Sequence, residues 1–302
     1  MLTNWSISED TLVTVASVFS VIYAINTICS TLLNGILVLI TIKSKSLHSA
    51  SNILIAAQAA TDLFLTWDVP VFAYHTFTRT FVPVSTCYLL QLFPSLSLNF
   101  TSVMLFLIGV DRYLSVQHAA WYALRNKFYY CAGHILIAVT CSVCFVAGFY
   151  FTTNEDQVLC FITDSMKGRL KDVWSGYQCL INVGVIVIYQ KTKNGLKAKS
   201  AIRNSDSRKI FASLYLIMIF YICSWLTAAT IFLIARVLTD DVRLTEAIEI
   251  VLSFTVALNL LVPFFVYYKR SNLYHREIRK LVGKESKVGT ASSVHNTSRT
   301  QR

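Results

Sequence analysis

The stretch CAGHILIAVTCSVCFVAGFYFT, residues 131–152, contains no Asp, Glu, Lys or Arg. A helix that crosses a lipid bilayer needs roughly 20 consecutive, mostly apolar residues, and this stretch is long enough for one. Inside lipid, only helices and closed barrels satisfy their own backbone hydrogen bonds. A barrel strand is a segment of about ten residues with alternating polarity, so this stretch predicts a membrane-spanning helix.

Six further apolar blocks of comparable length flank this one. The weakest is the fifth block in chain order, because Gln178 and Asn182 interrupt it. The sequence therefore predicts an all-α membrane protein, a seven-transmembrane helix bundle. The six blocks cover approximately residues 16–42, 51–75, 84–110, 173–190, 210–236 and 246–268.

The composition also favours a membrane protein over a soluble one. Of the 302 residues, 55% are hydrophobic and 14% are charged, whereas a soluble domain carries about 25% charged residues. The chain starts with MLTNWSISED, which has no basic residue. Because a cleaved signal peptide needs a basic start and a short apolar core, we interpret the first apolar block as an uncleaved span.

Lys and Arg are concentrated on one predicted side of the membrane. The segments at the ends of the first, third, fifth and seventh blocks hold 21 of the 27. Cytoplasmic loops carry an excess of positive charge, so we expect a plasma-membrane protein with an extracellular N-terminus and a cytoplasmic C-terminus. The net charge of +11 then reflects topology and attraction to anionic lipid, and we expect no nucleic-acid partner.

The segment after the last block, SNLYHREIRKLV at residues 271–282, mixes basic and apolar residues. This pattern predicts a short amphipathic helix on the inner membrane surface. Residues 1–282 would then form the membrane domain. Residues 283–302 are rich in Ser, Thr and Lys and are expected to be a disordered cytoplasmic tail.

Asp111, Arg112 and Tyr113 close the third block and place an ion pair at the inner membrane edge, where an unpaired charge is costly. Cys87 lies 25 residues earlier, which corresponds to roughly 37 Å of helix and places it at the outer rim. Cys160 lies in the loop between the fourth and fifth blocks. Both thiols would face an oxidising compartment and can form a disulfide bond. This bond would hold the loop over the bundle and define a pocket.

Polar residues recur every three or four positions along the third block and share one helical face. The outer parts of other blocks carry further polar residues. We expect these side chains to line a ligand cavity, although ordinary contacts between helices would also account for them. The third-block residues are Gln91, Ser95, Asn99 and Ser102, and the others are Asp68, His75, Gln178, Asn182, Trp225 and Glu249.

Several motifs together resemble the rhodopsin-like G-protein-coupled receptors, and most closely the nematode serpentine chemoreceptors of class SX. The resemblance covers most of residues 20–280. The motifs are LLNGILVL (32–39), SNILIAAQAATDLF (51–64), GVDRYLSVQHAAWY (109–122), Trp225 and PFFVYYKRSNLY (263–274).

The resemblance implies a chemosensory receptor that transmits the binding of an extracellular small molecule or short peptide to a heterotrimeric G protein. It assigns G-protein coupling to Asp111, Arg112 and Tyr113. Tyr189 and Tyr267 would swing toward Arg112 on activation, although both could be ordinary interfacial aromatics. Asp111 would hold Arg112 at rest, with Asp206 as a further partner.

The resemblance also implies a polar cluster at mid-membrane, often built around a sodium ion, formed here by Asn34, Asp62, Thr101 and Asn259. A purely structural hydrogen-bond cluster is the alternative. Pro94 occupies the position of the aspartate that amine receptors keep, and Ala257 that of the retinal lysine of opsins. Neither a biogenic amine held by that salt bridge nor retinal is therefore expected.

Two other functions are weighed against a receptor. A transporter for a small polar solute would show internal repeats or helices broken by Gly or Pro pairs, and the sequence shows neither. An intramembrane enzyme would need paired aspartates or a His-Glu-x-x-His motif, which are absent from the sequence. We therefore expect no catalytic activity, cofactor or resident metal. Asn4, in the sequon Asn4–Trp5–Ser6, is expected to carry an N-linked glycan.

Overall fold

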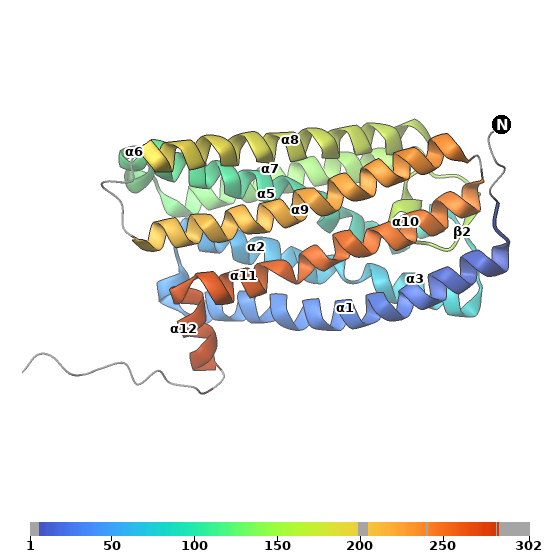
Figure 1. Cartoon of the computed structure of the whole chain (residues 1–302), viewed down its shortest axis with the longest axis horizontal. Helices are drawn as coiled ribbons and strands as arrows, with labels where there is room; N and C mark the ends of the chain where they lie inside the picture. Colours follow the sequence, from blue (N-terminus) through green and yellow to red (C-terminus); the bar gives the residue numbers. More distant parts are fainter. Residues whose placement is uncertain (1–5, 199–204, 240, 282, 284–302) are drawn as a thin grey trace, which may run out of the picture.

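The computed structural model describes residues 6–198, 205–239, 241–281 and 283. These residues form a bundle of long helices that run alongside one another (Figure 1). The predicted glycosylation site Asn4, the Ser and Thr residues of the predicted tail and the side chain of Asp206 lie outside the part of the chain that is described.

Helices account for nearly all of this structure, and the elements follow one another in this order. The first half contains α1 (Glu9–Lys43), η1 (Lys45–Leu47), α2 (Ala50–Leu65), α3 (Asp68–Thr78), β1 (Val82–Pro83), α4 (Val84–Leu90), α5 (Leu92–Gln117), α6 (Ala119–Leu124) and α7 (Lys127–Tyr150). The second half contains β2 (Gln157–Val158), η2 (Ile162–Ser165), α8 (Gly168–Ala198), α9 (Ser205–Leu238), α10 (Val242–Ala257), η3 (Leu258–Leu260), α11 (Val262–Arg270) and α12 (Asn272–Leu281).

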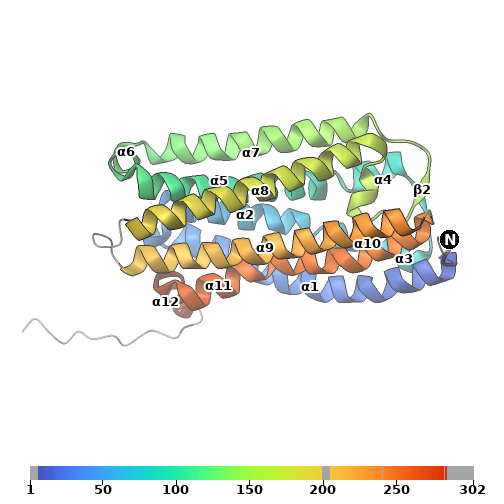
Figure 2. The same cartoon turned by 45° about the horizontal axis from the view of Figure 1, so that its top comes forward.

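Five helical stretches among the described residues are long and apolar enough to cross a membrane. The predicted second span is divided into α2 and α3, each shorter than the roughly 20 residues required. The predicted fifth span is α8, which is long enough but interrupted by Gln178 and Asn182. Both α2 and α8 nevertheless pack along α5 (Figure 2), so the all-α membrane bundle is confirmed. The five stretches are Glu9–Lys43, Leu92–Gln117, Lys127–Tyr150, Tyr215–Phe232 and Val242–Arg270.

Three prolines account for breaks within the predicted spans. Pro70, Pro94 and Pro263 lie in the first turns of α3, α5 and α11. A proline lacks the backbone N–H and clashes with the carbonyl four residues earlier, so one helix ends before it and another begins around it. The predicted third span is therefore α4 followed by α5, and the seventh is α10, η3 and α11.

Asparagines of α1 bond backbone carbonyls near the break in the seventh span. The side-chain amide of Asn34 donates to the carbonyl of Leu260 at 3.0 Å, and that of Asn26 donates to the carbonyl of Ala257 at 3.2 Å. A carbonyl without a partner is costly in lipid. These two side chains therefore stabilise the interrupted helix and hold α1 against it.

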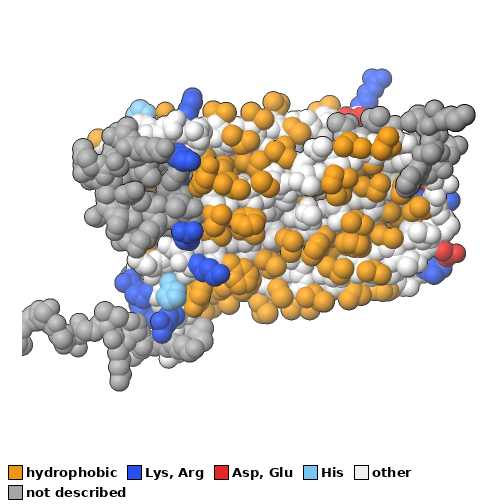
Figure 3. Space-filling model, viewed as in Figure 1, with side chains coloured by type: hydrophobic (Ala, Val, Ile, Leu, Met, Phe, Trp, Pro, Cys, Tyr) orange, Lys and Arg blue, Asp and Glu red, His pale blue; other side chains and the backbone are white. Residues whose placement is uncertain are grey.

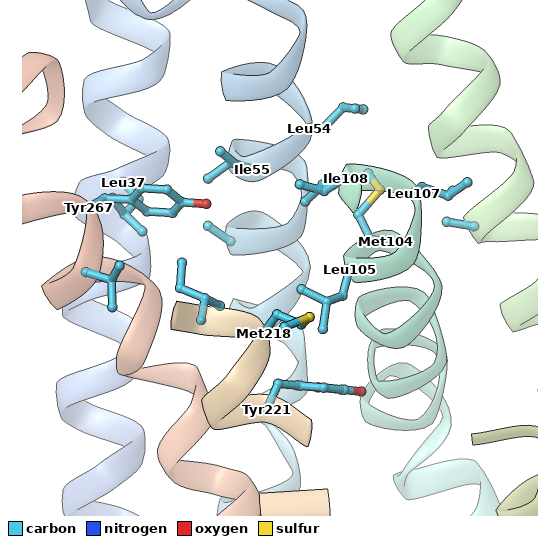
Figure 4. Close-up of a cluster of buried hydrophobic side chains, with 14 of the residues drawn as sticks. Leu37, Leu54, Ile55, Met104, Leu105, Leu107, Ile108, Met218, Tyr221 and Tyr267 are labelled. Carbon is cyan, nitrogen blue, oxygen red and sulfur yellow. The ribbon is translucent and has the colours of Figure 1, made fainter. Parts of the chain in front are cut away.

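The largest apolar core joins α1, α2, α5, α9 and α11. Figure 4 shows side chains from these helices meeting there, among them Leu37, Ile55, Ile108, Met218 and Tyr267. Helices in lipid associate through such close van der Waals packing, because lipid tails are as apolar as leucine. The core therefore fixes the relative positions of the helices that carry the predicted site residues.

The end of the bundle opposite α12 carries the predicted disulfide bond. Cys87 and Cys160 are bonded, with their Cα atoms 5.2 Å apart, and this prediction is confirmed. Beside it, β1 and β2 pair antiparallel, with Val82 opposite Val158. The sequence analysis did not predict these strands, since two residues are too few to show an alternating pattern.

The short helix predicted after the last span is confirmed as α12. In Figure 1 it turns away from the direction of the bundle helices. Its residues Tyr274 and Ile278 are buried, and the ring of Tyr274 stacks on Tyr267 at a centroid distance of 5.0 Å. Lys and Arg side chains gather around this end of the bundle (Figure 3), as expected from their concentration in the segments at the ends of the first, third, fifth and seventh blocks.

Candidate functional site

A cavity of about 430 Å³ lies among the helices on the disulfide side of the bundle, with walls from α1, α2, α5, α8, α9 and α10. Its volume falls within the range of small-molecule sites, about 300–1,000 Å³. The wall is mostly apolar. It includes six of the ten residues predicted to line a ligand cavity: Asp68, Ser102, Gln178, Asn182, Trp225 and Glu249.

The loop that carries Cys160 covers part of this cavity. Phe161, Ile162 and Thr163 belong to the wall, so the disulfide bond holds a cavity wall in place. The carboxylate of Asp164 accepts a hydrogen bond from the backbone N–H of Phe161 at 3.0 Å. Burial raises the pKa of Asp164, because taking a carboxylate out of water disfavours its charged form.

Gln91, predicted to bind a ligand, contacts the loop instead. Its amide nitrogen donates to Asp68 Oδ1 at 2.8 Å and to the carbonyl of Cys160 at 2.9 Å. Gln91 is absent from the described wall of the cavity. In this structure Gln91 holds the loop, which helical spacing alone did not reveal, and its role in ligand binding stays a prediction.

Ser95 and Asn99 also contact neighbouring parts of the chain, and their roles in ligand binding stay predictions. The hydroxyl of Ser95 lies 3.2 Å from that of Ser165 in the loop. The side-chain oxygen of Asn99 accepts a hydrogen bond from the indole N–H of Trp174 at 3.0 Å. Neither residue belongs to the described cavity wall, so both act in helix and loop packing in this structure.

The four residues predicted to cluster at mid-membrane are only partly brought together. Thr101 donates to Asp62 Oδ1 at 2.7 Å. Asn34 bonds the carbonyl of Leu260, as described above, and Asn259 donates to the hydroxyl of Ser224 at 2.6 Å. Asp62 is buried and borders the cavity. Among the described residues, these contacts therefore form three separate pairs and not one closed cluster.

At the α12 end of the bundle, Asp111 is fully buried and pairs with Arg125, whose Nη2 lies 3.5 Å from Asp111 Oδ1. Ser51 donates a short hydrogen bond to the same carboxylate, and the hydroxyl of Tyr122 donates to it at 2.8 Å. Burial raises the pKa of Tyr122, as does the adjacent charge of Asp111, so this hydroxyl keeps its proton and remains a donor.

Arg125 is further held by aromatic rings. Its guanidinium carbon lies 3.3 Å from the ring centroid of Tyr122 and 3.8 Å from that of Tyr130, which are cation–π contacts. The prediction that Asp111 holds Arg112 therefore differs from the structure, since the described ion pair of Asp111 is with Arg125. The sequence analysis missed Arg125, although the two flanking tyrosines were a usable signal.

Arg112 lies near the two tyrosines predicted to act with it. Its charge acts electrostatically on both Tyr189 and Tyr267, and both tyrosines are buried. The Nε and Nη2 atoms of Arg112 are buried and make no hydrogen bond to the described residues. Tyr113 lies outside this group, with its ring 6.4 Å from that of His118.

Comparison with known families decides the assignment. Residues 27–282 match the family described as serpentine type 7TM GPCR chemoreceptor Srsx. The chain belongs to this family. It is therefore a multi-pass membrane protein and a chemosensory G-protein-coupled receptor, and the resemblance found in the sequence is confirmed. A search among curated proteins finds no match.

In this receptor, the cavity and Arg112 lie in opposite halves of the bundle, and α5 connects them. α5 carries Thr101 and Ser102 at the cavity and Asp111 and Arg112 at the α12 end. One helix therefore reaches from the cavity wall to Arg112.

Proposed function

We propose that the receptor binds an extracellular small molecule or short peptide in the 430 Å³ cavity and engages a heterotrimeric G protein through Arg112. Asp68, Asn182, Trp225 and Glu249 line the ligand site in this proposal. Binding must favour one packing of the helices over another, because a ligand shifts an equilibrium only through differential affinity.

The observation that carries the proposal is the difference between two arginines near Asp111. Both arginines have buried Nε and Nη2 atoms that make no hydrogen bond to the described residues. Arg125 has an ion pair with Asp111 and two ring contacts, whereas the described residues hold no ion pair or ring contact of Arg112. A buried polar group without a partner costs free energy. Arg112 is thus a group that gains from a partner brought to this end of the bundle.

We also propose that the N-terminus lies outside the cell and the α12 end in the cytoplasm of a plasma-membrane receptor. The Lys and Arg residues around α12 support this orientation (Figure 3). In this orientation the cavity opens toward the outside of the cell, and the Ser- and Thr-rich tail is accessible to a cytoplasmic kinase and an arrestin.

Nucleotide exchange on purified heterotrimeric G proteins tests the proposal directly. The full-length receptor in lipid nanodiscs should raise the basal exchange rate of one G-protein class, and the Arg112→Ala variant should abolish this increase while keeping its surface expression. An Arg112→Ala receptor that reached the surface and stimulated exchange normally would overturn the proposed coupling.

A further inference from the structure

Two amide side chains of α8 border the cavity, one helical turn apart. Gln178 and Asn182 are both almost fully buried, with exposed fractions of 2% and 3%, and both belong to the cavity wall. Residues four apart lie on the same helical face. α8 packs against α5 and α9 (Figure 2), so this face points into the bundle.

The hydrogen-bonding capacity of these two side chains is largely unused. Neither the oxygen nor the nitrogen of the Gln178 side chain bonds a described residue, and the same holds for the side-chain oxygen of Asn182. The nitrogen of Asn182 donates to the backbone carbonyl of Gln178 at 2.9 Å. Two acceptors and one donor therefore remain available at one place on the cavity wall.

Gln91 provides the internal comparison. It is the same residue type and is fully buried as well. Its oxygen also makes no hydrogen bond to the described residues, but its nitrogen makes two, to Asp68 and to the carbonyl of Cys160. Burying an amide without a partner destabilises a protein, whereas burying a bonded amide does not. Gln91 therefore serves the fold, and Gln178 requires another explanation.

The unused atoms define the complementary group. Gln178 and Asn182 offer two acceptors, which need N–H or O–H donors, and Gln178 offers one donor, which needs an acceptor. An ammonium group has no acceptor, and a carboxylate has no donor. A neutral amide-type group, with N–H and C=O side by side, supplies both.

The charged residues of the wall point the same way. Lys171 is paired with Glu249 at 3.1 Å, and Asp62 and Asp68 place two further carboxyl groups on the wall. An anionic ligand would meet these carboxyl groups, and the one lysine of the described wall is already paired. The remaining wall is mostly apolar, which suits a hydrocarbon body.

We propose that Gln178 and Asn182 form the polar end of the ligand site and select a neutral ligand with an apolar body and an amide-type head group. The inference rests on the proposed function, since it takes the cavity to be the ligand site. It adds the chemical class of the ligand and the residues that read it.

The first experiment needs no ligand. In the full-length receptor in nanodiscs, Gln178→Leu should raise the midpoint of thermal unfolding by roughly 2–4 °C. The reason is that leucine has a volume similar to that of glutamine and carries no polar atoms that would be buried without a hydrogen bond. Gln91→Leu is the matched variant and should lower the midpoint. A Gln178→Leu receptor destabilised as much as Gln91→Leu would show that Gln178 serves the fold, and the inference would be overturned.

The second experiment measures ligand class with probes that share one hydrocarbon chain: octanamide, octylammonium and octanoate. Octanamide should stabilise the wild-type receptor most, and Gln178→Leu and Asn182→Leu should each remove that preference. Ser142→Ala is the control, because Ser142 lies on α7 away from the cavity wall and its hydroxyl bonds the carbonyl of Ala138 at 2.7 Å. It should leave the preference intact.

The outcomes separate this inference from the proposed function. Stabilisation by octylammonium or octanoate above octanamide, or by none of the three, would overturn the assigned head group. Neither result bears on whether the wild-type receptor stimulates nucleotide exchange on a G protein. A wild-type receptor that prefers octanamide but does not stimulate exchange would instead overturn the proposed coupling and leave the ligand class unchanged.

Discussion

Asp111 forms its ion pair with Arg125, which is fourteen positions later in the chain, across a distance of 3.5 Å. This pair ties α5 to the segment that follows α6. Removing one partner of a buried ion pair costs about 3–5 kcal/mol, because the other charge stays buried without compensation. Both side chains are well buried, with exposed fractions of 0% and 9%.

We therefore expect Asp111→Asn and Arg125→Ala each to lower the thermal unfolding midpoint and to raise basal nucleotide exchange by releasing α6 from α5. The double variant should be no worse than the more severe single variant, since both remove the same interaction. Thermal unfolding and exchange assays on the three purified variants measure this. A rise in basal exchange for Asp111→Asn alone would show that Asp111 restrains Arg112 instead.

Gly109 and Tyr189 are in close contact, and this contact gives a second prediction. A Cβ atom at Gly109 would lie 2.7 Å from Tyr189 Cε2 and 2.8 Å from Ile188 Cγ2, so Gly109→Ala must displace the tyrosine ring from its position near Arg112. We expect reduced G-protein exchange with normal octanamide binding. Gly133→Ala is the control, because a Cβ there meets nothing within 4 Å; equal losses in both variants would contradict the prediction.

The disulfide bond between Cys87 and Cys160 should be required for expression. Breaking a native disulfide typically costs about 2–5 kcal/mol, so Cys87→Ala and Cys160→Ala should each reduce the surface level, measured by flow cytometry of an N-terminally tagged receptor. The double variant should be no worse than either single one. Cys144→Ala is the control, since Cys144 is a free cysteine. Normal surface levels for both single variants would refute the requirement.

Glycosylation tests the proposed orientation. Asn4 heads a sequon near the N-terminus and should carry a glycan if that end is extracellular. Asn99 lies inside α5, and Asn296 belongs to the proposed cytoplasmic tail, so both sequons should remain unmodified. Glycosidase treatment should change the electrophoretic mobility of the wild-type receptor and not of Asn4→Gln. A mobility shift that persisted in Asn4→Gln would show that the glycan is attached to another residue or that the proposed topology is inverted.

The tail should terminate signalling. Each phosphate on a tail Ser or Thr adds roughly −1.5 to −2 charges and can bind Arg and Lys clusters of a partner. Truncation after Gly283 should therefore prolong the second-messenger response and reduce arrestin recruitment in cells. Alanine replacement of the tail Ser and Thr residues at full length is the matched comparison and should act similarly. Unchanged desensitisation in both forms would exclude this role.

Much of the architecture was predictable because membrane helices are encoded locally. Roughly 20 apolar residues in a row define a span without reference to any other part of the chain. The predicted apolar blocks accordingly correspond to helices of the bundle. The break in the seventh predicted span follows from Pro263 on the same local grounds. The Cys87–Cys160 bond was predictable because helix rise places one cysteine at the rim and the loop supplies the other.

The candidate site was predictable only in part, because a helical face says nothing about what covers it. Gln91 and Gln178 were both expected at the ligand cavity. Gln91 bonds Asp68 and Cys160, whereas Gln178 borders the cavity without such a bond. The two glutamines differ in their neighbours, which come from other elements of the chain.

By itself, the sequence determined the all-α membrane bundle, the side on which positive charge collects and the family motif around Arg112. Only the tertiary structure decided that Asp111 pairs with Arg125 and that Gln178 keeps its amide unbonded at a cavity. The physical reason is that hydropathy and helical rise depend on residues a few positions apart. Ion pairs and cavities depend on distances of a few ångströms between residues whose separation along the chain does not reveal whether they meet.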